Sequence, residues 1–295
     1  MKDAVRTSRT PPENPVLKDP DVPSHKKSGG RSLGQAIVTA VVLVLALIGF
    51  YLLGATAFFG LICIVVLLAL FELLDALKKA GRRPVIPFGL ACGLGMLVVA
   101  YLERPAFFGV VLAVTVFGSL LLGLRPGRGA TPASDASWTV LAVMWICGGG
   151  AAATAITRLD PGGLNLLVAM VGIVAVDDIA AYFTGTAFGK HKLAPSISPA
   201  KSWEGWAGGV VAAIGAGIVA SLVLDELILL HGLDIALIVG LFNPVGDLVE
   251  SSAKREIGIK DSSGLLPGHG GMLDRLDAIL FCAPAVYLYL RFVVF

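Results

Sequence analysis

The sequence predicts an all-α, polytopic integral membrane protein with about nine transmembrane helices, and three observations lead to this prediction. Of the 295 residues, 56% are hydrophobic and only 15% are charged, whereas soluble domains are about half apolar and a quarter charged. The mean hydropathy is +0.84. Apolar stretches of about 20 residues, the length that crosses a bilayer, recur along the chain. The net charge of +2 is too small to indicate a nucleic acid partner.

A polar, proline-punctuated tail over residues 1–31 precedes the apolar stretches. It has no apolar periodicity, so we expect it to be a disordered cytoplasmic tail rather than a cleaved signal peptide. Five spans at 32–160 form an N-terminal scaffold, and four spans at 161–295 carry nearly all of the polar motifs. The predicted spans are 33–53, 55–74, 85–102, 106–124, 137–157, 163–187, 205–230, 233–252 and 275–295. The acids Glu72 and Asp75, late in the second span, are expected at the membrane surface.

The distribution of positive charge predicts a cytoplasmic N-terminus. The chain has 23 lysines and arginines. All but Arg104, Arg158 and Arg291 fall in the tail or in alternate loops between the predicted spans. Because cytoplasmic loops carry the excess of lysine and arginine, the tail and these loops are expected on the inner side of the membrane.

A polar stripe is predicted at the end of the eighth span. Its members lie three or four positions apart and therefore share one helical face: Asp247, Glu250, Ser251 and Lys254. Facing lipid would cost too much, so the stripe is expected to face water or the protein interior. Asn243-Pro244 should kink this helix and leave carbonyls free. A simple salt bridge from Asp247 or Glu250 to Lys254 is the alternative interpretation.

A charged, glycine-rich loop follows and leads into the ninth span. Its candidate residues are Lys260, Asp261, His269, Gly270 and Gly271. Glycines let backbone N–H groups approach an anion closely. Asp274 and Asp277, either side of Arg275 and three positions apart, share a face in the first helical turn, where the helix dipole favours carboxylates. Plain capping is the alternative, and it is strongest for Asp277.

Three acids at the two helix ends, Asp247, Asp274 and Asp277, could converge on a divalent cation. Oxygen ligands with positions left for phosphates favour Mg²⁺. The cysteines lie far apart within apolar segments and the histidines are unpaired, so zinc is not indicated. A phosphate loop of the GxxxxGK[ST] type is absent from the sequence.

A second polar group is predicted from the sixth and seventh spans. Asp178, Tyr182 and Gly185 share a helical face, which predicts the wall of a cavity; the alternative is a structural carboxylate at the membrane rim. Ser198–Gly205 is expected to open the seventh span. A helix N-terminus with Lys201 and hydroxyls could cradle a phosphate, and ordinary flanking and capping is the alternative.

These motifs together resemble the phosphatidate cytidylyltransferase family, also called CDP-diacylglycerol synthases. The resemblance covers residues 165–280 closely. It is carried by Ser251, Lys254-Arg255, Lys260-Asp261, Leu266-Pro267-Gly268-His269-Gly270-Gly271, Asp274-Arg275-Leu276-Asp277, Asp178, Tyr182 and Ser198–Gly205. Ala200, Ala253 and Asn243-Pro244 depart from the family pattern without removing any of its acids or bases.

The resemblance implies transfer of CMP from CTP to phosphatidic acid, giving CDP-diacylglycerol and pyrophosphate. It implies Mg²⁺ at Asp247, Asp274 and Asp277, a monovalent cation such as K⁺ beside it, a homodimer, and a multi-pass protein of the cell membrane whose site faces the cytoplasm. The implied catalytic residues are Asp247, Lys254, Arg255, Lys260, Asp261, His269, Asp274 and Arg275. The implied substrate-binding residues are Asp178, Tyr182, Ser198, Lys201, Ser202, Glu204, Ser251, Gly270 and Gly271.

Two other functions remain open from the sequence. A CTP-dependent polyprenol kinase would also need a cytoplasmic metal site, but it would release CDP instead of pyrophosphate. A secondary transporter would explain kinked helices and intramembrane acids. It predicts inverted repeats, which the two halves of the sequence do not show.

Overall fold

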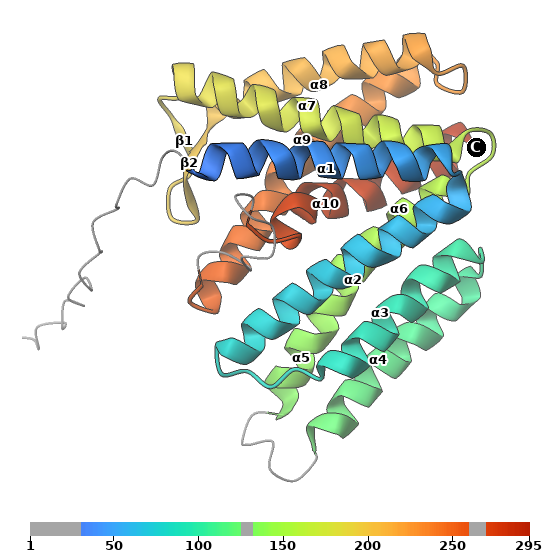
Figure 1. The fold of residues 1–295 in the computed structure, drawn as a ribbon, viewed down its shortest axis with the longest axis vertical. Coiled ribbons are helices and arrows are strands. Elements are labelled where there is room, and N and C mark those ends of the chain that lie inside the picture. Colours follow the sequence, from blue (N-terminus) through green and yellow to red (C-terminus); the bar gives the residue numbers. More distant parts are fainter. Residues whose placement is uncertain (1–30, 125–131, 260–269) are drawn as a thin grey trace, which may run out of the picture.

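A computed structural model describes residues 31–124, 132–259 and 270–295, with side chains from Val38 onward. The described chain is helical except for one short hairpin (Figure 1). The predicted tail up to residue 30 and three predicted site residues, Lys260, Asp261 and His269, lie outside the described residues.

The helices follow the predicted spans closely. They are α1 (Arg31–Leu52), α2 (Ala55–Lys79), α3 (Ile86–Tyr101), η1 (Pro105–Phe107), α4 (Phe108–Gly123), α5 (Pro132–Ala142), η2 (Val143–Cys147), α6 (Gly148–Thr157), α7 (Gly163–Phe188), α8 (Trp203–Val223), α9 (Leu229–Glu256), α10 (Leu273–Tyr289) and η3 (Leu290–Val294). In the described chain seven helices are long and apolar enough to cross a membrane. Two more, Val38–Leu52 and α3, are apolar but shorter. The all-α polytopic membrane fold is confirmed, while the count of nine stays a prediction.

The predicted seventh span, 205–230, begins close to α8, but its expected opening segment and its end are wrong. Residues Lys192–Ala194 form strand β1 and Ser198–Ser202 form strand β2, an antiparallel hairpin, so α8 begins only at Trp203. At the other end α8 stops at Val223 instead of residue 230. Leu224 is extended, and Asp225 and Glu226 then break the apolar run.

Helix α10 packs against both halves of the chain. Figure 1 shows α7, α8 and α9 side by side, with α2 to α6 forming a second group of helices. Helix α10 contacts α9 from the first group and α2 and α6 from the second. Pro284 lacks an N–H, so the carbonyl of Leu280, four residues earlier, has no helical donor. Gly149 of α6 lies directly against this carbonyl, where a larger residue would collide with it.

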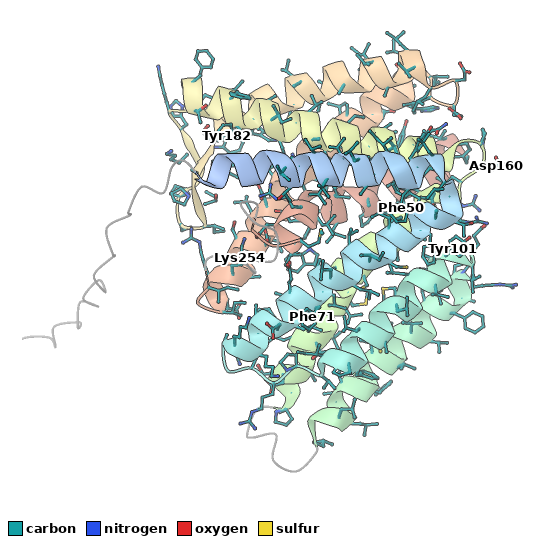
Figure 2. All side chains as sticks on the ribbon, viewed as in Figure 1. Phe50, Phe71, Tyr101, Asp160, Tyr182 and Lys254 are labelled. Carbon is teal, nitrogen blue, oxygen red and sulfur yellow. The ribbon has the colours of Figure 1, made fainter. Side chains whose placement is uncertain are left out.

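The charged loops divide between two ends of the molecule. Figure 2 places Lys254 at one end and Tyr101 and Asp160 at the other. At the Tyr101 end, Arg158 forms an ion pair of 3.0 Å with Glu103 and stacks over the Tyr101 ring. This separation agrees with the predicted alternation of loops. That the Lys254 end faces the cytoplasm stays a prediction.

Candidate active site

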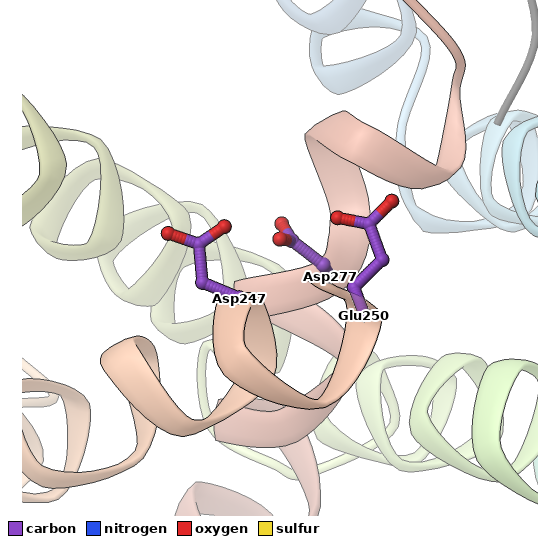
Figure 3. A group of neighbouring side chains, drawn as sticks. All are labelled: Asp247, Glu250 and Asp277. Carbon is purple, nitrogen blue, oxygen red and sulfur yellow. The ribbon is translucent and has the colours of Figure 1, made fainter. Parts of the chain in front are cut away.

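Three carboxylates from α9 and α10 form the centre of the site. The side chains of Asp247, Glu250 and Asp277 bring one oxygen each to within 4.8 Å of one another. Figure 3 shows Asp277 between the other two. Glu250 and Asp277 are only 3% and 5% exposed, and Asp277 Oδ2 has no hydrogen-bond partner among the described residues. Buried like charges repel one another unless a cation or protons offset them, so this cluster has the character of a cation site.

The carboxylates meet because α9 and α10 come unusually close at Gly246. A Cβ atom at this position would lie 2.6 Å from the carbonyl oxygen of Asp277 and 2.9 Å from the Cα of Ala278. Both neighbours are backbone atoms, so they cannot turn away as a side chain could. Glycine next to Asp247 is therefore what permits Asp247 and Asp277 to share one site.

We expect Gly246→Ala to lower the rate of the reaction at this site by about 10²-fold, because displacing reacting groups by about 1 Å costs that much. The extra methyl would push α10, and Asp277 with it, away from α9. Gly215→Ala in α8 is the matched control, because a Cβ atom there meets nothing within 4 Å. Turnover and melting temperature of both purified variants are the measurements. Wild-type turnover in Gly246→Ala would show that the helix spacing does not set the activity.

Lys254 connects the carboxylate cluster to Asp274. Its ammonium lies 3.1 Å from Glu250 and 2.6 Å from Asp274, and the lysine side chain is 15% exposed. The alternative interpretation of the stripe, a salt bridge from Glu250 to Lys254, is thus present, but it borders a larger acidic cluster. A lysine held between acids can offset their charge while no cation is bound.

Asp274, a predicted metal ligand, lies beside the cluster and not within it. Its Oδ1 accepts from Lys254 and its Oδ2 accepts the backbone N–H of Gly271 at 2.7 Å. Gly270, with φ near +80°, brings the chain around Asp274. Two of the three predicted ligands, Asp247 and Asp277, are therefore together. Glu250, which the sequence placed on the same stripe without a metal role, is the third member of the cluster.

A cavity of about 260 Å³ opens beside Asp247, between α7, α8, α9 and the hairpin. The predicted residues that line it are Asp178, Tyr182, Lys201, Ser202 and Asp247. Lys201 forms an ion pair with Asp247. Because Asp247 belongs both to the cavity and to the carboxylate cluster, the two groups predicted separately from the sequence form one continuous site.

The floor of this cavity contains two residues that the sequence analysis missed. Asp177 and Asn243 are each 3% exposed, and the amide of Asn243 donates to both Asp177 and Asp178. Asp177 Oδ1 and Asn243 Oδ1 have no partner among the described residues. Asn243 lies one turn before Asp247, so extending the polar stripe by one turn would have found it. Asp177 could have been found only as the neighbour of Asp178.

As predicted, Pro244 leaves a backbone carbonyl without its helical donor, and a side chain from α8 donates to this carbonyl instead. The missing N–H of Pro244 leaves the carbonyl of Gly240 without its helical donor. The indole Nε1 of Trp206 donates to that carbonyl at 2.8 Å. This hydrogen bond ties the first turn of α8, which follows the hairpin, to α9 at the level of the cavity.

The hairpin forms the outer wall of the cavity and is held in place by the start of α8. Ser202 caps this helix, its Oγ accepting from the N–H of Gly205 at 3.1 Å. Glu204 accepts the backbone N–H groups of Lys190 and His191 and contacts the His191 ring at 2.6 Å. Both residues were predicted to bind substrate. In this structure their polar groups hold the hairpin.

The remaining predicted residues are spread around the site. Arg255 and Arg275 are exposed at the ends of α9 and α10, Tyr182 is 66% exposed at the cavity rim, and Ser251 is half-buried. Ser198 pairs with Ala194 in the hairpin. None of these positions conflicts with contact to a substrate.

Fold and site together define a polytopic membrane protein that combines a buried carboxylate cluster with lysines and a polar cavity at one end of its helices. This set of groups suits phosphoryl-transfer chemistry.

Comparison with known proteins identifies the family. The profile of the Cytidylyltransferase family matches residues 34–293. The chain is 34% identical to the phosphatidate cytidylyltransferase of Mycobacterium bovis, over 95% of both chains. It is also 34% identical to that of Brucella suis, over 88% of this chain and 93% of the relative. Over 44% of each chain it is 40% identical to the uncharacterized protein YnbB of Escherichia coli. The chain belongs to the cytidylyltransferase family and is a membrane enzyme of the nucleotidyltransferase class.

Proposed function

We propose that this protein transfers CMP from CTP to phosphatidic acid, producing CDP-diacylglycerol and pyrophosphate. The observation that supports this most directly is the continuity, through Asp247, between the carboxylate cluster and the polar cavity that Lys201 lines. The relatives from Mycobacterium bovis and Brucella suis carry the name of this activity. A nucleoside triphosphate bound through cations at the cluster would have its phosphates next to the polar cavity.

The residues present fit a divalent cation. Asp247, Glu250 and Asp277 supply hard oxygen ligands close together, and the unpartnered Oδ2 of Asp277 is a buried acceptor without a donor among the described residues. Mg²⁺ prefers such ligands and retains positions for substrate phosphates. When bound, it would neutralise charge on the triphosphate and polarise the α-phosphate. Asp274 lies beside this set and could join it if Lys254 moves. K⁺ as a second ion rests on the family resemblance alone.

The reaction needs no separate nucleophile on the protein. An oxygen of the lipid phosphate attacks the α-phosphorus of CTP, and the bond from that phosphorus to the bridging oxygen of the β-phosphate breaks. Pyrophosphate leaves with this electron pair. Because the attacking phosphate is already anionic, no general base is required, and the work of the protein is positioning and charge neutralisation.

Two lysines are placed to supply that neutralisation. Lys201 pairs with Asp247, and Lys254 pairs with Glu250 and Asp274. A cation held by these carboxylates would compete with the lysines for them, and both ammonium groups would then be available to the phosphates. Each lysine would thus offset the charge first of the acids and then of the bound anions. Arg255, Arg275 and the N–H of Gly270 could contribute from the rim.

The site would lie on the cytoplasmic face of the cell membrane, where CTP is available. The cavity is lined by Asp178 and Tyr182 in the second half of α7, and we propose that phosphatidic acid enters laterally with its acyl chains left in the bilayer. The family resemblance also favours a homodimer, which light scattering of the purified protein would test.

We expect purified protein in detergent, supplied with CTP, phosphatidic acid and Mg²⁺, to release pyrophosphate and CDP-diacylglycerol in equal amounts. Omitting either the lipid or Mg²⁺ is expected to stop the release. Anion-exchange analysis of the nucleotide products distinguishes the alternatives, because a polyprenol kinase would release CDP. Release of CDP, or no nucleotide turnover with this lipid, would contradict the proposed function.

A further inference from the structure

A buried acid in the N-terminal half, Glu72 of α2, contacts the helix that carries Asp274 and Asp277. Glu72 is only 3% exposed, and its Oε2 accepts the backbone N–H of Leu273 at 3.0 Å. The sequence had placed Glu72 at the membrane surface with Asp75. The structure encloses Glu72 between α2 and α10, and the depth of both acids relative to the membrane stays a prediction. Asp75 is partly exposed and pairs with Lys79 at 2.7 Å.

The first turn of α10 depends on this contact because its own sequence provides no cap. The N-terminal N–H groups of a helix need acceptors from outside the helix. Such acceptors usually come from a serine, threonine, aspartate or asparagine at the N-cap. Here the N-cap is Met272, whose side chain makes no capping hydrogen bond. Asp274 accepts from Gly271 just before the helix, and Glu72 accepts from Leu273.

The carboxylate of Glu72 also helps to set the position of α10. It interacts favourably with the positive end of the α10 dipole, and the apolar residues around it, Leu73, Leu74 and Leu77, are buried. The α2 helix therefore holds its acid rigidly. Leu273 directly precedes Asp274, and Asp277 lies one turn further. A shift of Leu273 would thus move both acids relative to Asp247 and Glu250.

We propose that Glu72 is a positioning residue for the active site: it caps α10 from α2 and sets the distance between Asp277 and the acids of α9. This inference rests on the proposed function for its turnover readout and on the proposed cation site for its Mg²⁺ readout. It assigns to the N-terminal helices a part in the geometry of the site. The contact joins residues 201 positions apart.

The test compares Glu72→Ala, Glu72→Asp and Glu72→Gln with Asp75→Asn as the control on the same helix. Glu72→Ala and the shorter Glu72→Asp lose the reach to Leu273. For both we expect turnover to fall by about 10- to 100-fold, as for lost supporting contacts at metal sites. The Mg²⁺ concentration that half-saturates turnover is expected to rise by about the same factor. Glu72→Gln keeps an acceptor oxygen and loses only the charge at the helix dipole, so it is expected within about fivefold of wild type. Asp75→Asn is expected to match wild type.

A second readout separates this role from a purely structural one and from the reaction itself. The melting temperature is measured against Mg²⁺ alone, without substrate, on the monodisperse fraction of each variant. For the alanine and aspartate variants, we expect the Mg²⁺ concentration at the midpoint of the thermal shift to rise. The factor is expected to be at least that by which the Mg²⁺ concentration that half-saturates turnover rises. Unchanged midpoints, even with lower melting temperatures, would overturn the proposal. If the alanine variant does not fold, equal midpoints for Glu72→Asp and Glu72→Gln would overturn it. Because no turnover is needed, this result is independent of the lipid and nucleotide substrates.

Discussion

Replacing Asp277 by asparagine is expected to lower the rate of CMP transfer by about 10²- to 10³-fold, the cost of losing one preorganised electrostatic group such as an oxyanion-hole donor. Asp277 lies between Asp247 and Glu250, where the backbones of α9 and α10 approach closely at Gly246. Asparagine keeps the size of the side chain but offers a cation a neutral oxygen. The loss therefore reports on the charge and not on packing.

The same variant carries a second, opposite expectation for stability. Without a cation, three carboxylates lie close together and one oxygen of Asp277 lacks a partner among the described residues. Removing one negative charge relieves this repulsion. We expect Asp277→Asn to melt at or above the temperature of wild type in chelator and to lose most of the Mg²⁺-induced rise. Asp75→Asn is the control for charge. Wild-type turnover, or an unchanged response to Mg²⁺, would remove Asp277 from the cation site.

Lys254→Met is expected to lower both activity and stability strongly. Its ammonium holds Glu250 and Asp274 at 3.1 and 2.6 Å, and breaking a buried pair leaves uncompensated charge that costs about 3–5 kcal/mol. Turnover is expected to fall by about 10²-fold, because the same ammonium would neutralise the phosphates. Lys79→Met, an exposed lysine with a helical partner, is the control.

A double variant separates the two roles of Lys254. Adding Asp274→Asn to Lys254→Met removes one of the acids left without its cation. We expect the melting temperature to recover in part while turnover stays low. If turnover recovered together with the melting temperature, Lys254 would be a structural residue only. Detergent melting curves and pyrophosphate release on the same preparations are sufficient for this comparison.

The relation between sequence and site is clearest for the acids. Asp247, Glu250 and Lys254 share a helical face, so the sequence could place them in one stripe. Which of Asp274 and Asp277 lies with Asp247 and Glu250 depends on the rotation of α10 against α9, and the close approach at Gly246 brings Asp277 there. From the sequence alone, capping is the stronger alternative for Asp277. In the structure Asp277 joins the cluster, while Asp274 contacts Lys254 and Gly271.

The hairpin shows a different limit of sequence reasoning. Serines, a lysine and an acid before an apolar run are typical of a helix start, and Ser202 does cap α8. The residues before it pair with β1, and Glu204 accepts the N–H groups of Lys190 and His191 just before that strand. That contact links positions 13 and 14 residues apart. No local pattern indicates it.

By itself the sequence determined the membrane class, the span boundaries to within a few residues at most positions, and the chemistry of the polar end, because hydrophobic length and helical spacing are local properties. The tertiary structure alone decided which acids meet, how the hairpin closes the cavity, and that Glu72 caps α10 from 201 positions away. These outcomes depend on how closely and at what rotation helices pack. Close backbone contacts at Gly246 and buried hydrogen bonds between distant segments determine that packing.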